Sequence, residues 1–199
     1  MRGRFIVLEG ADGTGTTTQA RALAHHLGAK GRSVHVTAEP SRGPIGTLIR
    51  QMLGGDRPRE AIHRELALLF AADRLDHLAR EIEPNIAGGV DVISDRYLLS
   101  SLVYQSLDLP LSWVESLNQH APPADVTVVL TLPLDAALAR VAGRAGQPEV
   151  FDAREVQARV HARYLELAPR VAARVIDGGG AVDDVTARLC AVVDAALGA

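Results

Sequence analysis

Short apolar runs alternate along the chain with stretches in which apolar residues recur at helical spacing. The apolar runs are "FIVLE" at 5–9, "SVHVTAEP" at 33–40, "VDVISDR" at 90–96, "DVTVVLTL" at 125–132 and "RVIDG" at 174–178. Near-continuous apolar strands are typical of sheets that are covered on both faces. The pattern therefore predicts an α/β fold: a doubly wound, five-stranded parallel sheet flanked by helices, with right-handed crossovers.

The amphipathic stretches predict the helices between these strands. The first follows residue 15, with Ala20, Leu23 and Leu27 on one face and Gly28 as a stop signal. A much longer one covers 58–89 and is expected to be disturbed near Pro84. Others are expected at 44–53, 111–120, 134–144 and 156–171 and at the end of the chain, with an irregular segment at 145–150. With 199 residues and no repeat or linker, residues 1–199 are expected to form one domain.

Composition narrows the possible partners. Hydrophobic residues make up 47% of the chain and charged residues 23%, and the net charge is -3, so nothing draws the protein generally to nucleic acid or to an anionic membrane. The single cysteine, Cys190, lies in an apolar helical pattern and is expected to be packed. Without a signal peptide or a membrane-length apolar stretch, the protein is expected to be cytoplasmic.

The stretch "LEGADGTGTTTQA" at 8–20 matches a phosphate-binding loop, Gly-x-x-x-x-Gly-Lys-[Ser/Thr], except at one position. It follows a predicted strand and opens a predicted helix, so backbone N–H groups and the positive helix end converge on one anion site. Glycines 10, 13 and 15 allow the backbone to approach phosphates closely, and Thr17 is in register to bind Mg²⁺. These features predict a nucleotide site of the P-loop NTPase type.

The exception is Thr16, which stands where the motif has lysine. A threonine hydroxyl donates one neutral hydrogen bond but supplies no positive charge to the transferring phosphoryl group. Losing a preorganised contact of this kind commonly costs about 3–4 kcal/mol, or about 10²–10³ in rate. The site is therefore expected to bind nucleotide better than it turns it over, unless another cation replaces the lysine.

Two further segments have the composition of an acceptor site. In "LLFAADR", Phe70 and Arg74 are four residues apart and share a helix face, which places an aromatic ring beside a guanidinium that can pair with a phosphate. "SDRYLLSSLVYQS" begins at the carboxyl end of a predicted strand, where open α/β sheets bind ligands. It brings to that edge Asp95, Arg96, Ser100, Ser101, Tyr104 and Gln105. No Ser/His/Asp or metal-cluster arrangement competes, and the seven histidines are scattered and are assigned no chemistry.

Taken together, "LEGADGTGTTTQ", "EP", "LLFAADR", "SDRY", "YQ" and "RYLEL" resemble the thymidylate kinases in order and spacing over essentially the whole chain. The resemblance implies transfer of the γ-phosphoryl group of ATP to dTMP, with Mg²⁺, in a homodimer that forms through the long helix around 60–83. It also implies a lid around 143–153.

The resemblance assigns the site residues as well. Phe70 would stack on thymine, Arg74 and Gln105 would bind its edge, and Ser101 would line the base pocket. Arg96 would hold the acceptor phosphate, Tyr104 would pack against the deoxyribose, and Asp12 would face the sugar or that phosphate. The expected substrate-binding set is Asp12, Glu39, Arg42, Phe70, Arg74, Arg96, Ser101, Tyr104 and Gln105. The expected ATP-binding set is Gly10, Asp12, Gly13, Thr14, Gly15, Thr16, Thr17, Thr18 and Arg140. The expected catalytic residues are Asp95, Arg96 and Arg144, and the expected metal ligands are Thr17 and Asp95.

The chain departs from this family at three positions, and each removes a positive charge. Thr16 replaces the loop lysine, Ala38 stands where bacterial members usually carry arginine, and Val150 replaces a lid cation. The cations that remain near these places are Arg42, Arg140 and Arg144. Arg144, which a closing lid could bring over the phosphates, is the first candidate to replace the missing charge, with Arg42 and Arg140 as alternatives. Three functions therefore stay open: a working dTMP kinase with a compensating arginine, a nucleotide-binding pseudokinase, and a kinase for another nucleoside monophosphate.

Overall fold

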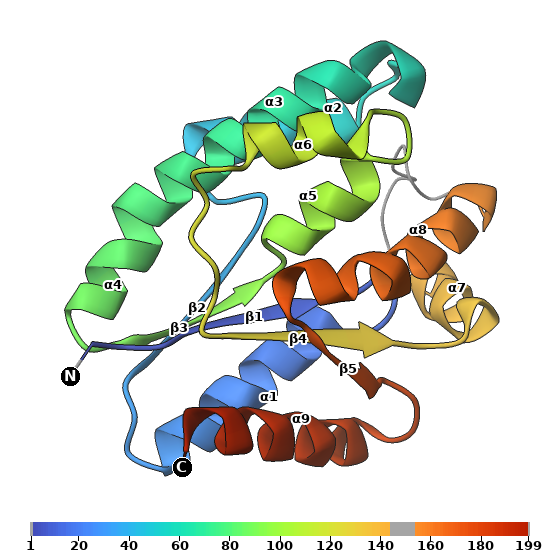
Figure 1. Ribbon diagram of the computed structural model, residues 1–199. Coiled ribbons are helices and arrows are strands. Elements are labelled where there is room, and N and C mark those ends of the chain that lie inside the picture. Colours follow the sequence, from blue (N-terminus) through green and yellow to red (C-terminus); the bar gives the residue numbers. More distant parts are fainter. Residues whose placement is uncertain (1, 144–153, 199) are drawn as a thin grey trace.

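Five parallel strands form one sheet in the computed structural model, which describes residues 2–143 and 154–198 (Figure 1). The strand order is β2-β3-β1-β4-β5, and each neighbouring pair is parallel. The strands are β1 (Phe5–Glu9), β2 (Val34–Ala38), β3 (Asp91–Asp95), β4 (Val126–Thr131) and β5 (Arg174–Asp177). The predicted five-stranded parallel sheet is confirmed.

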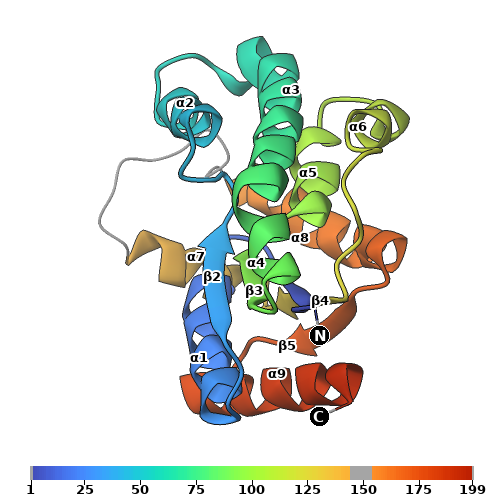
Figure 2. The same ribbon diagram turned by 90° about the vertical axis from the view of Figure 1, so that its left-hand side faces the viewer.

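Helices lie on both faces of this sheet (Figures 1 and 2). One face is covered by α1 (Thr16–Ala29) and α9 (Val182–Leu197), and the other helices gather above the opposite face and its end. Those helices are α2 (Pro44–Leu53), α3 (Arg59–His77), α4 (Glu83–Ala87), α5 (Leu98–Gln105), α6 (Leu111–Leu117), α7 (Leu134–Ala142) and α8 (Arg154–Leu167). A 3₁₀ turn, η2 (Ala168–Val171), follows α8.

The central strands β1, β3 and β4 are buried almost throughout because successive side chains point to opposite faces and both faces are covered, whereas the edge strands β2 and β5 are partly exposed. In β1, Ile6 and Leu8 pack in the core beneath α1 and α9, whereas Phe5 and Val7 pack against residues of the other layer. All four side chains are at most 3% exposed. This double burial anchors β1, the strand that leads into the glycine-rich loop, at the centre of the sheet.

The long helical stretch predicted over 58–89 is interrupted, as expected from its proline. After α3, residues Leu78–Ile82 form a π-helical turn, η1, and α4 begins at Glu83 directly before Pro84. Proline has no N–H to donate to the preceding turn, and a wider turn is one way for a helix to accommodate it.

The carboxyl ends of the central strands meet at one edge of the sheet, where the loops after β1, β2 and β3 lie close together. The β2–β3 pairing brings Ala38 opposite Asp95, and the β1–β3 pairing brings Leu8 opposite Asp95. The glycine loop, residue 39 and the segment after Asp95 therefore start from neighbouring points. None of the helices described for residues 2–143 and 154–198 is long and apolar enough to cross a membrane.

Candidate functional site

The loop between β1 and α1 has a backbone that only glycine can adopt at several points. Gly13 and Gly15 have φ angles of 84° and 97°, in the left-handed region. A Cβ at Gly10 would lie 2.5 Å from Thr14 Oγ1 and 2.7 Å from the Leu130 carbonyl oxygen. Thr14 Oγ1 itself donates to the Ala11 carbonyl at 2.8 Å, which closes the loop on itself. The loop ends at the N-terminus of α1, so its N–H groups and the positive helix end can bind an anion.

Thr17, at the start of α1, contacts the last residue of β3. Thr17 Oγ1 donates to Asp95 Oδ2 at 2.5 Å, and the other oxygen, Asp95 Oδ1, is buried without a hydrogen-bond partner. One hydroxyl and one carboxylate with a spare oxygen fit a Mg²⁺ ion that takes its remaining ligands from phosphates and water. Thr16, in the lysine position of the motif, is 6% exposed.

Arg140 is a cation held against this loop. It lies in the last turn of α7, whose backbone packs so closely on the loop that a Cβ at Gly13 would lie 2.3 Å from the Ala137 carbonyl oxygen. Arg140 Nη1 donates to the Gly13 carbonyl at 3.4 Å, and no described carboxylate lies within ion-pair distance of its guanidinium. Its charge therefore faces the hollow beside the loop. That hollow is lined by Gly13, Thr14, Gly15, Thr18, Gln19, Arg140, Gly178, Gly180, Val182 and Val185.

A second hollow lies across the loop and contains most of the predicted acceptor residues. It is lined by Asp12, Glu39, Pro40, Leu53, Phe70, Arg74, Arg96, Tyr97, Ser100, Ser101, Tyr104 and Gln105. Eight of the nine residues in the expected substrate-binding set are thus brought together from four segments. The ninth, Arg42, is exposed and does not line the hollow. Arg144 and the predicted lid around 143–153, apart from residue 143, lie outside the described residues.

The backbone of Arg96 is held in an unusual conformation. Its φ angle is 75°, a left-handed value that is uncommon for a residue other than glycine. Ser94 Oγ donates to the Arg96 carbonyl at 2.7 Å, and Arg96 N donates to the Leu8 carbonyl at 2.8 Å. Conformations of this kind occur where the surrounding structure imposes them, often at functional sites. Here the turn directs the arginine side chain toward the glycine loop.

The Arg96 guanidinium lies among oxygen atoms. Nη2 donates to Asp12 Oδ1 at 2.6 Å, and Nη1 donates to Tyr164 OH at 3.0 Å and to Tyr104 OH at 3.4 Å. Burial alone would lower the pKa of Arg96, but Tyr104, Tyr164, Asp12 and Asp95 outweigh it and raise the pKa well above its usual value. The guanidinium therefore stays charged and is preorganised for an anion.

Glu9, the last residue of β1, supports this arrangement from beneath. It is fully buried and accepts hydrogen bonds from the Ser100 hydroxyl at 2.6 Å, the Tyr97 backbone N–H at 3.0 Å and Tyr164 OH at 3.3 Å. Burial raises the pKa of its carboxyl group, although these hydrogen bonds and Arg96 act against the rise. Sequence reasoning missed Glu9 and Tyr164 as site residues. A carboxylate that closes an otherwise apolar strand was the available signal for Glu9.

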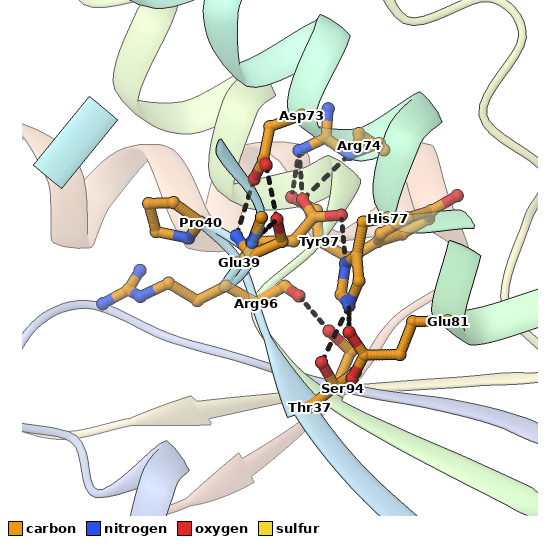
Figure 3. A network of polar contacts seen from close by, with 12 residues as sticks. Thr37, Glu39, Pro40, Asp73, Arg74, His77, Glu81, Ser94, Arg96 and Tyr97 are labelled. Atoms are coloured by element: carbon orange, nitrogen blue, oxygen red, sulfur yellow. Dashed lines mark hydrogen bonds and ion pairs between the residues drawn. The ribbon is translucent and has the colours of Figure 1, made fainter. Parts of the chain in front are cut away.

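Arg74 is almost completely buried, at 1% exposure, yet it lines the acceptor hollow. Its Nε and Nη2 both donate to Glu39 Oε2, at 3.0 and 2.8 Å, as Figure 3 shows. Nη2 also contacts Ser101 Oγ and the Tyr97 carbonyl, each at 2.9 Å. Nη1 contacts Asn118 Oδ1 alone among the described atoms, which leaves one of its two hydrogens free for a ligand.

The remaining walls of the acceptor hollow complete a site for a planar ring. Phe70, half-buried, lies on the same helix as Arg74 and lines the same hollow. Gln105 is 5% exposed, and its Oε1 is buried without a hydrogen-bond partner. An aromatic face, a guanidinium and an unpaired amide oxygen are the groups that recognise the face and edge of a nucleobase.

Comparison with known proteins agrees with this geometry. The family model described as thymidylate kinase matches residues 8–189. A "Probable thymidylate kinase" of Thermococcus onnurineus is 39% identical over 201 residues, covering 96% of this chain and 97% of the relative. One from Pyrococcus abyssi is 39% identical over 199 residues, covering 97% of each chain. The solved structure of thymidylate kinase from Candida albicans superposes with a TM-score of 0.80 at 26% identity, covering 98% of this chain and 92% of that one.

Proposed function

The chain belongs to the thymidylate kinase family, and we propose that it transfers the γ-phosphoryl group of ATP to dTMP between the two hollows beside its glycine loop. The single observation that carries the proposal is the convergence of Phe70, Arg74, Gln105 and Arg96 in one hollow directly beside that loop. An aromatic plate, two groups for a base edge and one arginine for a phosphate are what a pyrimidine monophosphate requires. Phosphoryl transfer needs positioning and charge rather than covalent chemistry from the protein.

The base end of the acceptor site selects a thymine. Phe70 stacks on the ring, the free N–H of Arg74 Nη1 donates to a carbonyl oxygen of the base, and Gln105 Oε1 accepts from a ring N–H. Ser101, whose hydroxyl holds Arg74, lines the same wall. Because these polar groups are buried, a base that leaves them unpaired is disfavoured.

The phosphate end places the acceptor oxygen near the loop. Arg96 holds the acceptor phosphate, and Tyr104, whose hydroxyl donates to Asp12 at 3.1 Å, packs against the sugar. Because Arg96 already contacts Asp12, the acceptor phosphate either displaces this carboxylate from the guanidinium or shares the guanidinium with it. Tyr164 and Glu9 keep the arginine in place while this exchange occurs.

ATP occupies the hollow on the other side of the loop. The backbone N–H groups of residues 13–18 cradle its phosphates, and Arg140 lies over the loop from α7. Thr17 and Asp95 hold Mg²⁺, which neutralises charge on the phosphates when bound. Another cation takes the part of the motif's lysine in this proposal, and Arg140 supports it because it contacts the loop at the Gly13 carbonyl and lines the same hollow.

The proposal extends to the chain as a whole. Residues 1–199 act as one kinase domain with a lid around 143–153, and two chains associate through the long helix. We also propose a cytoplasmic location, in keeping with the nucleotide substrates. The two alternatives, a pseudokinase and a kinase for another nucleoside monophosphate, are not favoured. Relatives that are 39% identical over nearly the whole chain are described as probable thymidylate kinases.

A coupled assay beside a binding measurement tests this function. Purified protein is given ATP and Mg²⁺ with dTMP, dUMP, dCMP or dGMP, and ATP binding is measured separately by calorimetry. Turnover with dTMP well above the other acceptors, abolished by EDTA, is the expected result. ATP binding without turnover of any acceptor would favour the pseudokinase, and preference for another acceptor would assign a different substrate.

A further inference from the structure

His77, the last residue of α3, lies behind the acceptor hollow and has no exposed side-chain surface. Its ring nitrogens face oxygens on both sides, as Figure 3 shows. Nδ1 lies 3.5 Å from Glu39 Oε1, and Nε2 lies 2.7 Å from Thr37 Oγ1 and 3.5 Å from Glu81 Oε2. The ring does not line the hollow, so it cannot touch a nucleotide there.

Glu39 connects this histidine to Arg74. The two oxygens of the Glu39 carboxylate have separate partners: Oε2 accepts from Arg74, and Oε1 faces His77. The Glu39 side chain is only 2% exposed, so water does not compensate for a lost partner. The carboxylate is thus held at both ends, by the guanidinium on the side of the hollow and by the imidazole behind it.

The position of one proton follows from this geometry. A bare Nδ1 would place its lone pair against a carboxylate oxygen, which is repulsive in a buried site. Nδ1 therefore carries a proton and donates to Glu39 Oε1. On the opposite side of the ring, Nε2 shares a hydrogen bond with Thr37 Oγ1 at 2.7 Å, whichever of these two atoms donates.

We propose that His77 is a positioning residue for base recognition, acting on Arg74 through Glu39. The Nδ1–H restrains the Glu39 carboxylate from rotating away from Arg74, and so keeps the guanidinium, with the N–H of Nη1 that no described acceptor binds, in its place on the wall of the hollow. Without it, Glu39 Oε1 becomes a buried acceptor with no donor, and the carboxylate turns to recover one. The guanidinium then loses its orientation toward the base. The inference rests on the proposed function, because the group it orients is the one that reads thymine.

Three substitutions at His77 separate this role from simple packing. An asparagine amide reaches only the position of Nδ1, a glutamine amide reaches that of Nε2, and a leucine supplies neither. His77→Asn therefore keeps a donor for Glu39, whereas His77→Gln and His77→Leu lose it. If the ring served only to fill space, glutamine and leucine, which are closer to histidine in size, would be tolerated better than asparagine.

The measurements are the Kd values for dTMP and for ATP by calorimetry, with the thermal midpoint of each variant. His77→Leu and His77→Gln are expected to weaken dTMP on the order of 10-fold and to leave ATP unchanged. They should also lower the preference for dTMP over dCMP, because an amino group replaces the carbonyl that Arg74 reads. His77→Asn should restore both quantities to within about 3-fold of the wild type, whatever its thermal midpoint.

A control variant removes a neighbouring imidazole that does not reach Glu39. His35 Nε2 lies 2.7 Å from Glu81 Oε1, the carboxylate oxygen that does not face His77. His35→Gln should therefore leave dTMP affinity unchanged. Unchanged dTMP binding in His77→Leu, or equal weakening of dTMP and ATP in all three His77 variants, would overturn the inference while leaving the proposed function intact. A wild-type protein that does not bind dTMP would refute the proposed function, and this inference would fall with it.

Discussion

Arg96 donates from Nη2 to Asp12 Oδ1 over 2.6 Å, which joins the turn after β3 to the glycine loop after β1. The two residues are 84 positions apart in the chain, and their side chains are 20% and 31% exposed. The contact places the cation of the acceptor hollow and a carboxylate of the donor loop in one partly buried ion pair. Changes at either residue should therefore affect the two substrates differently.

Replacing Arg96 should affect dTMP much more than ATP. Arg96→Ala removes the guanidinium for the acceptor phosphate, and dTMP affinity should fall on the order of 100-fold, because truncating one side of a buried charge-assisted pair commonly costs 2–5 kcal/mol. ATP affinity should change by less than about 3-fold, since the loop cradle is backbone. Arg96→Lys is the matched control and should recover only part of the loss, because lysine keeps the charge but not the planar fork. Equal weakening of both nucleotides would contradict the assignment.

The stability of the sheet should depend on pH through Asp91, at the start of β3. Burial disfavours its charged form, but hydrogen bonds from Arg32 and from the Arg4 backbone, together with those two charges, outweigh burial and lower the pKa of Asp91 below 3.8. A carboxyl with a lowered pKa in the folded state stabilises the protein above its unfolded pKa, and this contribution is lost as the pH falls below 3.8 toward the folded value.

Asp91→Asn should accordingly reduce the free energy of unfolding by about 1–3 kcal/mol at pH 7. The difference from the wild type should persist at pH 5 and shrink at pH 3, because below 3.8 the unfolded wild-type chain binds the proton more readily than the folded one does. Urea unfolding of the two proteins at these three pH values measures it. A difference that stays constant from pH 7 to pH 3 would show that the charge of Asp91 does not contribute.

The parts of the site that could be predicted from the sequence are those with a local signal. The glycine spacing identified the loop, and Phe70 and Arg74 share a helix face because they are four residues apart. Asp95 and Arg96 could be placed because parallel strands end at a common edge. Each of these inferences needs only one segment and a general rule about the fold.

The supporting contacts could not be predicted in this way, because each joins segments that are distant in the chain. Tyr164 reaches Glu9 across 155 positions, and Asn118 reaches Arg74 across 44. Tyr164 lies on a helix whose pattern predicts only a buried aromatic. The left-handed φ angle of Arg96 likewise follows from the packing around Ser94 rather than from a turn signal such as glycine.

The association of two chains should occur through the outer face of α3. Leu68 and Leu75 are seven residues apart and therefore lie on one face of the helix. Their exposed fractions are 51% and 44%, and Leu48 on the adjacent α2 is 44% exposed. Light scattering at micromolar concentration should give twice the mass of one chain, and Leu75→Glu should reduce it to that of one. Leu165→Glu, at a leucine on α8 that is 52% exposed, should leave the mass unchanged. A monomeric wild type would rule the interface out.

Restoring the loop lysine should speed catalysis more than it tightens ATP. The backbone cradle supplies most of the ground-state affinity, whereas a lysine acts chiefly on charge that develops in the transition state. Thr16→Lys is therefore expected to raise kcat by about 10-fold to 10³-fold, with a much smaller change in ATP Kd. The lower end applies if an arginine already supplies charge to the transferring group. Unchanged kcat with retained binding would show that the lysine position is not what limits this enzyme.

Arg140 is the described cation best placed to be that arginine, because its guanidinium contacts the loop at Gly13 and lines the hollow beside it, whereas Arg42 lines neither of the two hollows. Arg140→Ala should lower kcat on the order of 100-fold with Thr16 and by less than about 10-fold with Thr16→Lys, because two cations that serve one charge are not additive. Arg144→Ala, made in the same two backgrounds, tests the arginine of the expected lid by the same criterion. If Arg140→Ala instead weakens ATP equally in both backgrounds and leaves kcat unchanged, the guanidinium serves ATP binding alone and does not replace the lysine. If kcat falls by the same factor in both backgrounds, Arg140 acts on catalysis independently of the lysine position.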